Sequence, residues 1–141
     1  SGSEIRKEEL IDLLNKKKLS NKFTFLGYVE EVPKFLNSID LVLMPSLSNE
    51  SIPYAIMESL RSKKPVIASD VGSHYEAVFN SYNGYIYKNA DELNNILKLL
   101  ILNKSKIQQM SNNAYQTFID NFSTKNTSLK FIKIYKDLLN I

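Results

Sequence analysis

Short, almost continuously apolar segments alternate along this chain with longer segments of helical periodicity, and this alternation restricts the fold strongly. The pattern predicts strands at Lys22–Leu26, Leu41–Met44, Pro65–Ala68 and Gly84–Tyr87. It predicts helices at Glu4–Asn15, Pro33–Ser38, Pro53–Arg61, His74–Phe79, Ala90–Leu102, Lys104–Asn121 and Lys125–Leu139. Apolar strands separated by helices are typical of parallel pairing with helices on both faces of the sheet. The sequence therefore predicts a doubly wound, Rossmann-like α/β fold with a helical C-terminal tail.

The size of the chain predicts one domain over residues 1–141, because 141 residues with 43% hydrophobic content suffice for one core. Two features indicate that this domain is incomplete. The chain begins with a helix, and a doubly wound sheet of only four strands is small. The last helix also carries more apolar residues than one face needs, namely Leu129, Phe131, Ile132, Ile134, Tyr135, Leu138 and Leu139. We expect a missing sheet edge and a missing partner surface.

The composition argues against several classes of protein. The chain has no cysteine and a single histidine, His74, so it offers neither a thiolate metal site nor a histidine cluster. The net charge of +3 is scattered except at Lys16–Lys18, which ends a predicted helix and does not indicate nucleic-acid binding. The apolar stretch Ile96–Leu102 is far shorter than the ~20 residues of a membrane span, and no secretory signal is apparent. We expect a cytoplasmic protein that requires no metal.

Two glutamates, Glu50 and Glu58, stand eight residues apart where a predicted strand gives way to a helix. Pro53 suits the first turn of that helix, so Glu50 falls in the loop and Glu58 within the helix. Ligands of such sheets collect at the carboxyl ends of strands, where helix N-termini offer free N–H groups. The spacing indicates a site for a polyhydroxylated, phosphate-bearing ligand. The alternative is that both are surface charges, as glutamates near helix starts commonly are.

Several segments, taken in order, resemble the C-terminal domain of GT-B glycosyltransferases of the group 1 type. They are Phe23–Val29, Ile39–Ser46, the E-x7-E pair Glu50 and Glu58, Pro65–Gly72 followed by Glu76, Asn83–Ile86, and the tail at Phe122–Ser123 and Tyr135. The resemblance implies a retaining enzyme that moves a sugar from a nucleotide-diphosphate sugar to an acceptor glycan or lipid-linked glycan, as in surface polysaccharide synthesis. It implies no cofactor. A separate N-terminal domain, absent here, would hold the acceptor, and the longer enzyme could lie at the inner face of the membrane.

The resemblance also assigns roles to individual residues. Glu58 would accept hydrogen bonds from the ribose hydroxyls, and the catalytic Glu50 would lie against the donor sugar and stabilise positive charge in the transition state. Gly72 and Glu76 would support the loop behind the site. The other donor-binding candidates are the N–H groups of Ser51 and Ile52 and a base-binding loop at Gly27, Tyr28 and Val29. We expect His74 and Tyr75 to be packing or surface residues.

Three positions depart from the family's pattern, because Ser51, Lys63 and Ser73 stand where glycines are usual. Lys63 follows a predicted helix, so we expect either that it adopts a positive φ, at a cost of about 1 kcal/mol, or that the loop is re-routed. The basic residues that grip the diphosphate in the family would precede this chain. We therefore expect the chain alone to fold without transferring sugar. A non-catalytic nucleotide-sugar-binding or assembly module with the same fold remains the alternative, and the Glu50 and Glu58 spacing argues against a sugar-nucleotide epimerase.

Overall fold

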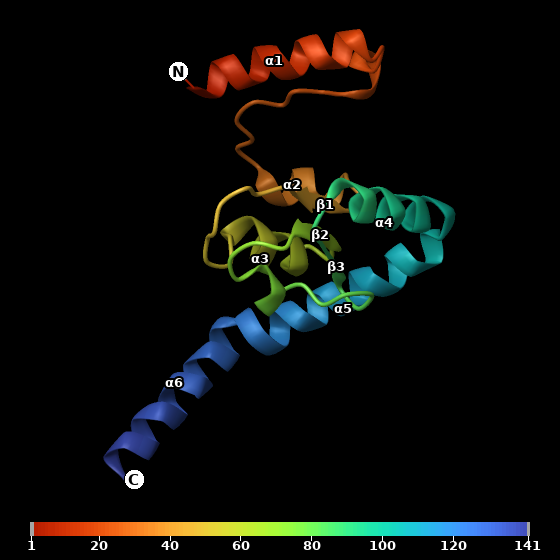
Figure 1. Cartoon of the computed structure of the whole chain (residues 1–141). Coiled ribbons are helices and arrows are strands. Elements are labelled where there is room, and N and C mark those ends of the chain that lie inside the picture. Colours follow the sequence, from red (N-terminus) through yellow and green to blue (C-terminus); the bar gives the residue numbers. More distant parts are fainter. Residues whose placement is uncertain (1, 141) are drawn as a thin grey trace. The chain divides into compact units, whose positions relative to one another are not determined.

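The computed structural model describes the backbone of residues 2–140 and the side chains of residues 6–140. The chain divides into two compact units, Ser1–Glu30 and Glu31–Ile141 (Figure 1). In chain order the elements are α1 (Gly2–Lys16), η1 (Ser20–Lys22), α2 (Val32–Asn37), β1 (Val42–Met44), α3 (Tyr54–Arg61), β2 (Val66–Ser69), η2 (His74–Glu76), β3 (Gly84–Tyr87), α4 (Ala90–Leu102), α5 (Lys104–Phe122) and α6 (Thr124–Leu139). None of the described helices is long and apolar enough to cross a membrane.

The second unit is built on a parallel sheet in the order β1-β2-β3, which confirms the predicted doubly wound class. Val42 lies beside Val66, and Ile67 lies beside Tyr85, so equivalent positions of neighbouring strands share a face. All four residues of β2 are buried, as expected for a central strand covered on both sides.

Helices cover both faces of this sheet. Val66 and Ala68 point to one face, where they pack with Ile56 and Leu60 of α3 and with the later part of α5. Ile67 and Tyr85 point to the other face, and they pack with α4 and with the early part of α5, mainly Leu100 and Met110. This alternation follows from the two-residue period of a strand.

The predicted helix His74–Phe79 is shorter than expected and forms only the single turn η2. The buried side chain of Asn83 accepts a hydrogen bond from the Phe79 N–H at 2.7 Å, so that N–H is not available to continue the helix. Asn83 Nδ2 also donates to the Ala77 carbonyl at 2.8 Å and to Thr117 Oγ1 at 3.0 Å. Asn83 thereby fastens the segment after η2 to α5.

The predicted strand Lys22–Leu26 is wrong, because residues 23–27 form no ladder with any described strand. Lys22 closes η1, and the side chains of Phe23, Phe25 and Leu26 stay exposed. A strand is stabilised by hydrogen bonds to a neighbour, and an apolar pattern without that neighbour leaves only extended backbone.

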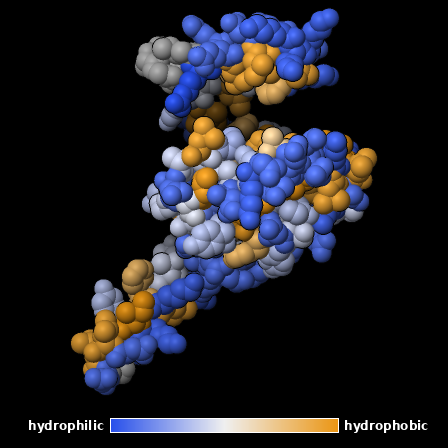
Figure 2. All heavy atoms as spheres, in the orientation of Figure 1, coloured by the Kyte–Doolittle hydropathy of each residue, from blue (hydrophilic) through white to orange (hydrophobic). Residues whose placement is uncertain are grey.

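The C-terminal helix α6 carries the apolar excess that the sequence predicted, and the described part of the chain leaves it uncovered. Figure 2 shows orange apolar residues along this helix beside blue polar ones. No residue of α6 is buried, and the side chains of Phe131, Leu138 and Leu139 are all more than half exposed.

The end of α3 explains why Lys63 tolerates a left-handed conformation. Lys63 has φ +60°, which confirms the prediction made from its place after the helix. The Lys64 N–H donates to the Ser59 carbonyl at 2.8 Å, and the Lys63 N–H donates to the Leu60 carbonyl at 3.1 Å. These two bonds form the Schellman motif, which satisfies the last carbonyls of the helix and usually places glycine at this position. The Lys63 ammonium also lies 5.3 Å from the centre of the Tyr115 ring.

We expect the Lys63→Gly variant to be more stable than the Lys63→Ala variant by about 1 kcal/mol. Both substitutions remove the ammonium from the Tyr115 ring, so their difference isolates the backbone strain at this position. Urea denaturation of the two variants measures that difference. Equal stability would contradict the account of the helix end.

Candidate functional site

The loops that follow β1 and β2 are fastened to each other at the carboxyl ends of these strands. The Ser73 N–H donates to the Glu50 carbonyl at 3.0 Å, and the Gly72 N–H donates to Asn49 Oδ1 at 3.2 Å. Ser69 Oγ donates to the Ser46 carbonyl at 2.8 Å. Glu50 therefore occupies the edge of the sheet where ligands of this fold class bind, as the sequence predicted.

Gly72 brings the two loops close enough for these bonds to form. Its φ is +53°, and a Cβ at this position would fall 2.0 Å from the Glu50 carbonyl oxygen and 2.6 Å from the Glu50 nitrogen. No side chain fits there, because the atoms in the way belong to the backbone. Gly72 supports Glu50 by direct contact with its main chain.

The imidazole of His74 lies behind the carboxylate of Glu50. His74 is fully buried, and its Nε2 is 3.3 Å from Glu50 Oε1. Its Nδ1 is 2.9 Å from the Ser69 carbonyl oxygen. The Glu50 side chain is 39% exposed, so the carboxylate is supported from within and remains accessible from outside.

The surroundings of Glu50 favour its ionised form. Hydrogen bonding from the Ser46 side chain, together with the hydrogen bond and charge of His74, holds the pKa of Glu50 below its ordinary value. Partial desolvation acts in the opposite direction and does not reverse this shift. At neutral pH the side chain is therefore a carboxylate that can stabilise positive charge.

Ser51, Ile52 and Pro53 separate Glu50 from the first turn of α3, which begins at Tyr54. Pro53 precedes the helix with extended backbone and provides no side-chain cap. Among the backbone hydrogen bonds of the described residues, none takes up the N–H of Ser51 or Ile52. The Ile52 side chain packs against the core beside α3, which fixes this turn to the sheet. These two N–H groups lie in the loop just before the positive end of α3, where an anion is favoured.

Glu58 lies further along α3 and faces a different hollow. Its exposed side chain borders a cavity of about 310 Å³ between α2 and α3, lined also by Val32, Pro33, Leu36, Asn37, Arg61 and Ser62. The two glutamates thus have distinct environments: Glu50 contacts a buried imidazole, and Glu58 borders an open cleft.

The remaining predicted site residues do not join this arrangement in the same way. Gly27, Tyr28 and Val29 belong to the first unit, so their part in a shared site stays a prediction. Glu76 is exposed in η2, and its N–H bonds the Ser73 carbonyl at 3.0 Å. A role for its carboxylate likewise stays a prediction.

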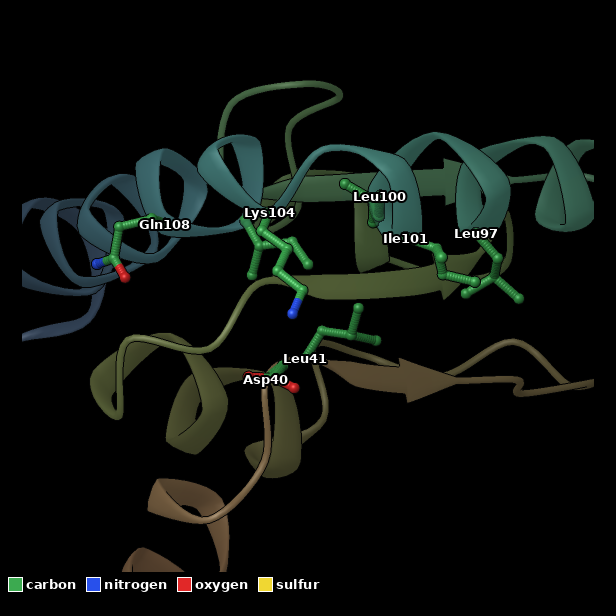
Figure 3. A pocket seen from close by; sticks show the side chains of 8 residues that line it. Asp40, Leu41, Leu97, Leu100, Ile101, Lys104 and Gln108 are labelled. Carbon is green, nitrogen blue, oxygen red and sulfur yellow. The ribbon is translucent and has the colours of Figure 1, made fainter. Parts of the chain in front are cut away.

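A larger cavity, of about 580 Å³, is lined by none of these residues. Figure 3 shows the side chains that line it. Asp40 and Leu41 line it just before β1, at the amino end of that strand. The rest of the lining comes from α4 and α5 and comprises Leu97, Leu100, Ile101, Lys104, Ile107 and Gln108. It lies at the edge of the sheet opposite to Glu50.

Comparison with known proteins decides the family. Residues 1–117 match the family described as Glycosyl transferases group 1. The chain belongs to this family. Its fold is that of the C-terminal domains of GT-B glycosyltransferases, with a parallel sheet, helices on both faces and a helical tail.

Relatives of this domain include glycosyltransferases named for O-antigen biosynthesis and for a diphosphoundecaprenol-linked sugar acceptor. The O-antigen biosynthesis glycosyltransferase WclY of Escherichia coli is 26% identical over 138 residues, which are 98% of this chain and 38% of that protein. The UDP-Gal:alpha-D-GlcNAc-diphosphoundecaprenol alpha-1,3-galactosyltransferase of the same species is 25% identical, over 86% of this chain and 31% of that protein. The crystal structure of Anabaena HepE in complex with UDP is 26% identical with a TM-score of 0.84, over 99% of this chain and 38% of that chain. The domain thus spans between 31% and 38% of the length of these relatives.

The sequence did not reveal the residues that hold Glu50 in place. His74 was expected to be a packing or surface residue; it is indeed buried, but it also contacts Glu50. Asn49, Ser46 and Ser69 were not singled out either. A lone histidine or serine carries no spacing signal, and only the pairing of β1 with β2 brings these side chains together.

In the glycosyltransferase domain we expect Gly72→Ala to separate the two loops, with a cost of about 1 to 3 kcal/mol for the overpacking. The bond from the Ser73 N–H to the Glu50 carbonyl should break, so amide exchange at Ser73 should become fast. The control is Gly27→Ala, because Gly27 has a similar φ of +66° and no atom within 4 Å of an added Cβ. Slow exchange at Ser73 in both variants would show that Gly72 does not govern the loop contact.

Proposed function

We propose that this domain is the donor-binding part of a retaining glycosyltransferase that uses a uridine-diphosphate sugar. The observation that carries the proposal is the carboxylate of Glu50, which is ionised, accessible and fastened at the carboxyl ends of β1 and β2. The family of the chain supports the same chemistry.

Glu50 would act on the transferred sugar by electrostatics. Departure of the nucleotide diphosphate leaves positive charge on the anomeric carbon and the ring oxygen, in an oxocarbenium-like transition state. A carboxylate already oriented by its surroundings stabilises that charge without a cost of reorganisation. The free N–H groups of Ser51 and Ile52 would stabilise the negative charge that develops on the leaving diphosphate.

Glu58 would bind the nucleoside. A carboxylate accepts hydrogen bonds from two adjacent hydroxyls at once, and the ribose offers such a pair. The cleft between α2 and α3 beside Glu58 provides room for it. Anabaena HepE was solved with UDP and with UDP-glucose at 26% identity to this chain, which supports uridine as the base.

The acceptor would be a glycan, in line with relatives that act in O-antigen synthesis or on diphosphoundecaprenol-linked sugars. Because the chain spans 38% of the length of its first relatives, we infer that further segments of a longer enzyme hold that acceptor. A lipid-linked acceptor would bring the longer enzyme to a membrane surface.

We expect UDP to bind the chain more tightly than GDP or ADP, and we expect Glu58→Gln to weaken UDP binding by about tenfold to a hundredfold. The loss follows from the hydrogen bonds that the ribose makes to the carboxylate. Titration by NMR or calorimetry, with each nucleotide against the wild-type chain and the variant, measures both effects.

The matched control for this titration is Asp137→Asn on the exposed helix α6. Both substitutions remove one negative charge, which by itself favours an anionic ligand, so a loss confined to Glu58→Gln marks a direct contact. Equal UDP affinity in the wild-type chain and in both variants would contradict the role given to Glu58.

A further inference from the structure

His74 is the single histidine of the chain, and both of its ring nitrogens face oxygen acceptors. Nδ1 is 2.9 Å from the carbonyl oxygen of Ser69, at the end of β2. Nε2 is 3.3 Å from Glu50 Oε1, in the loop after β1. The ring thus spans the carboxyl ends of two neighbouring strands and is fully buried there.

The chemistry of these two acceptors fixes the position of the protons. A carbonyl oxygen can only accept, so Nδ1 must carry a hydrogen to bond Ser69. A neutral imidazole has only one such hydrogen, and its Nε2 would then present a lone pair to the carboxylate. The contact between Nε2 and Oε1 is attractive only if a second proton lies between them.

We propose that His74 is a positioning residue for Glu50, and that it holds the carboxylate through a proton shared between Nε2 and Oε1. This inference rests on the role proposed above for Glu50 in sugar transfer. The Ser69 carbonyl takes the hydrogen on Nδ1, so a second hydrogen on Nε2 is what the contact with Oε1 requires, and with it the pair is an imidazolium beside a carboxylate.

The other charged groups near His74 leave Glu50 as its direct partner. In the loop that follows β2, the carboxylate of Asp70 lies 4.0 Å from Lys88 Nζ, a residue that follows β3. The Glu76 carboxylate is exposed in η2. Among the described ion pairs of the chain, Glu50 is the carboxylate within reach of the imidazole.

This arrangement has two consequences for the donor. The bond to Nε2 engages one carboxylate oxygen, Oε1, and so orients the other oxygen for the sugar. The positive ring also offsets part of the repulsion between the Glu50 carboxylate and an incoming diphosphate, but solvent and salt weaken this effect because the Glu50 side chain is 39% exposed. Loss of the ring should therefore affect the orientation of Glu50 more strongly than it affects nucleotide binding.

The first test is the ¹⁵N NMR spectrum of the ring, which needs no assignment because the chain has one histidine. At pH 7 the wild-type chain should show a directly bonded hydrogen on both ring nitrogens. The Glu50→Gln variant should lose the hydrogen on Nε2 and keep the one on Nδ1, because the neutral amide no longer favours an imidazolium. A wild-type ring without a proton on Nε2 would overturn the proposal.

The second test uses the longer transferase and two substitutions of His74. His74→Asn can keep the bond to the Ser69 carbonyl but cannot reach Glu50, so kcat should fall by about tenfold to a hundredfold with little change in KM for the donor. His74→Gln can place its amide near Glu50 and should recover part of this loss. Wild-type kcat in a folded His74→Asn variant would overturn the proposal.

The two tests separate this inference from the proposed function. The ring spectrum reports the proton between His74 and Glu50 whether or not the domain binds a nucleotide sugar. Should the buried substitutions prevent folding, the spectra of the wild type and of Glu50→Gln still decide the matter. If the enzyme transfers sugar but Nε2 carries no proton, the proposed function stands and the inference about His74 is wrong.

Discussion

The site of this glycosyltransferase domain depends on the close contact between the loops that follow β1 and β2. Gly72 allows the two main chains to meet, and the Ser73 N–H and the His74 ring then hold the backbone and the carboxylate of Glu50, respectively. Parallel strands make such contacts available, because their carboxyl ends lie at one edge of the sheet. The buried β2 fixes the starting points of both loops. These contacts orient the side chain of Glu50, which would otherwise be flexible at the surface.

Glu50 and Glu58 differ in how strongly the surrounding structure restrains them. Glu50 is restrained by bonds to its main chain and its side chain, which agrees with the role in the transition state that we propose for it. Glu58 lies on a regular helix and borders an open cleft, which agrees with the nucleoside-binding role that we propose for it. The spacing of eight residues places one in the loop and the other on α3.

Much of the fold could be predicted from the sequence, because the pattern of β1, β2 and β3 and of the helices around them is local. The strand at Lys22–Leu26 could not, since an apolar segment becomes a strand only when a neighbour pairs with it. The left-handed Lys63 was predictable from its place after α3. The contact of His74 with Glu50 was not, because it joins residues 24 positions apart through the pairing of two strands.

The most direct test of this account is the kinetic comparison of Glu50→Gln and Glu58→Gln in the longer transferase that we propose. If Glu50 stabilises the transition state, Glu50→Gln should lower kcat by about a hundredfold or more and leave KM for the nucleotide sugar nearly unchanged. Glu58→Gln should act chiefly by raising that KM. A Glu50→Gln enzyme with wild-type kcat would contradict the central claim.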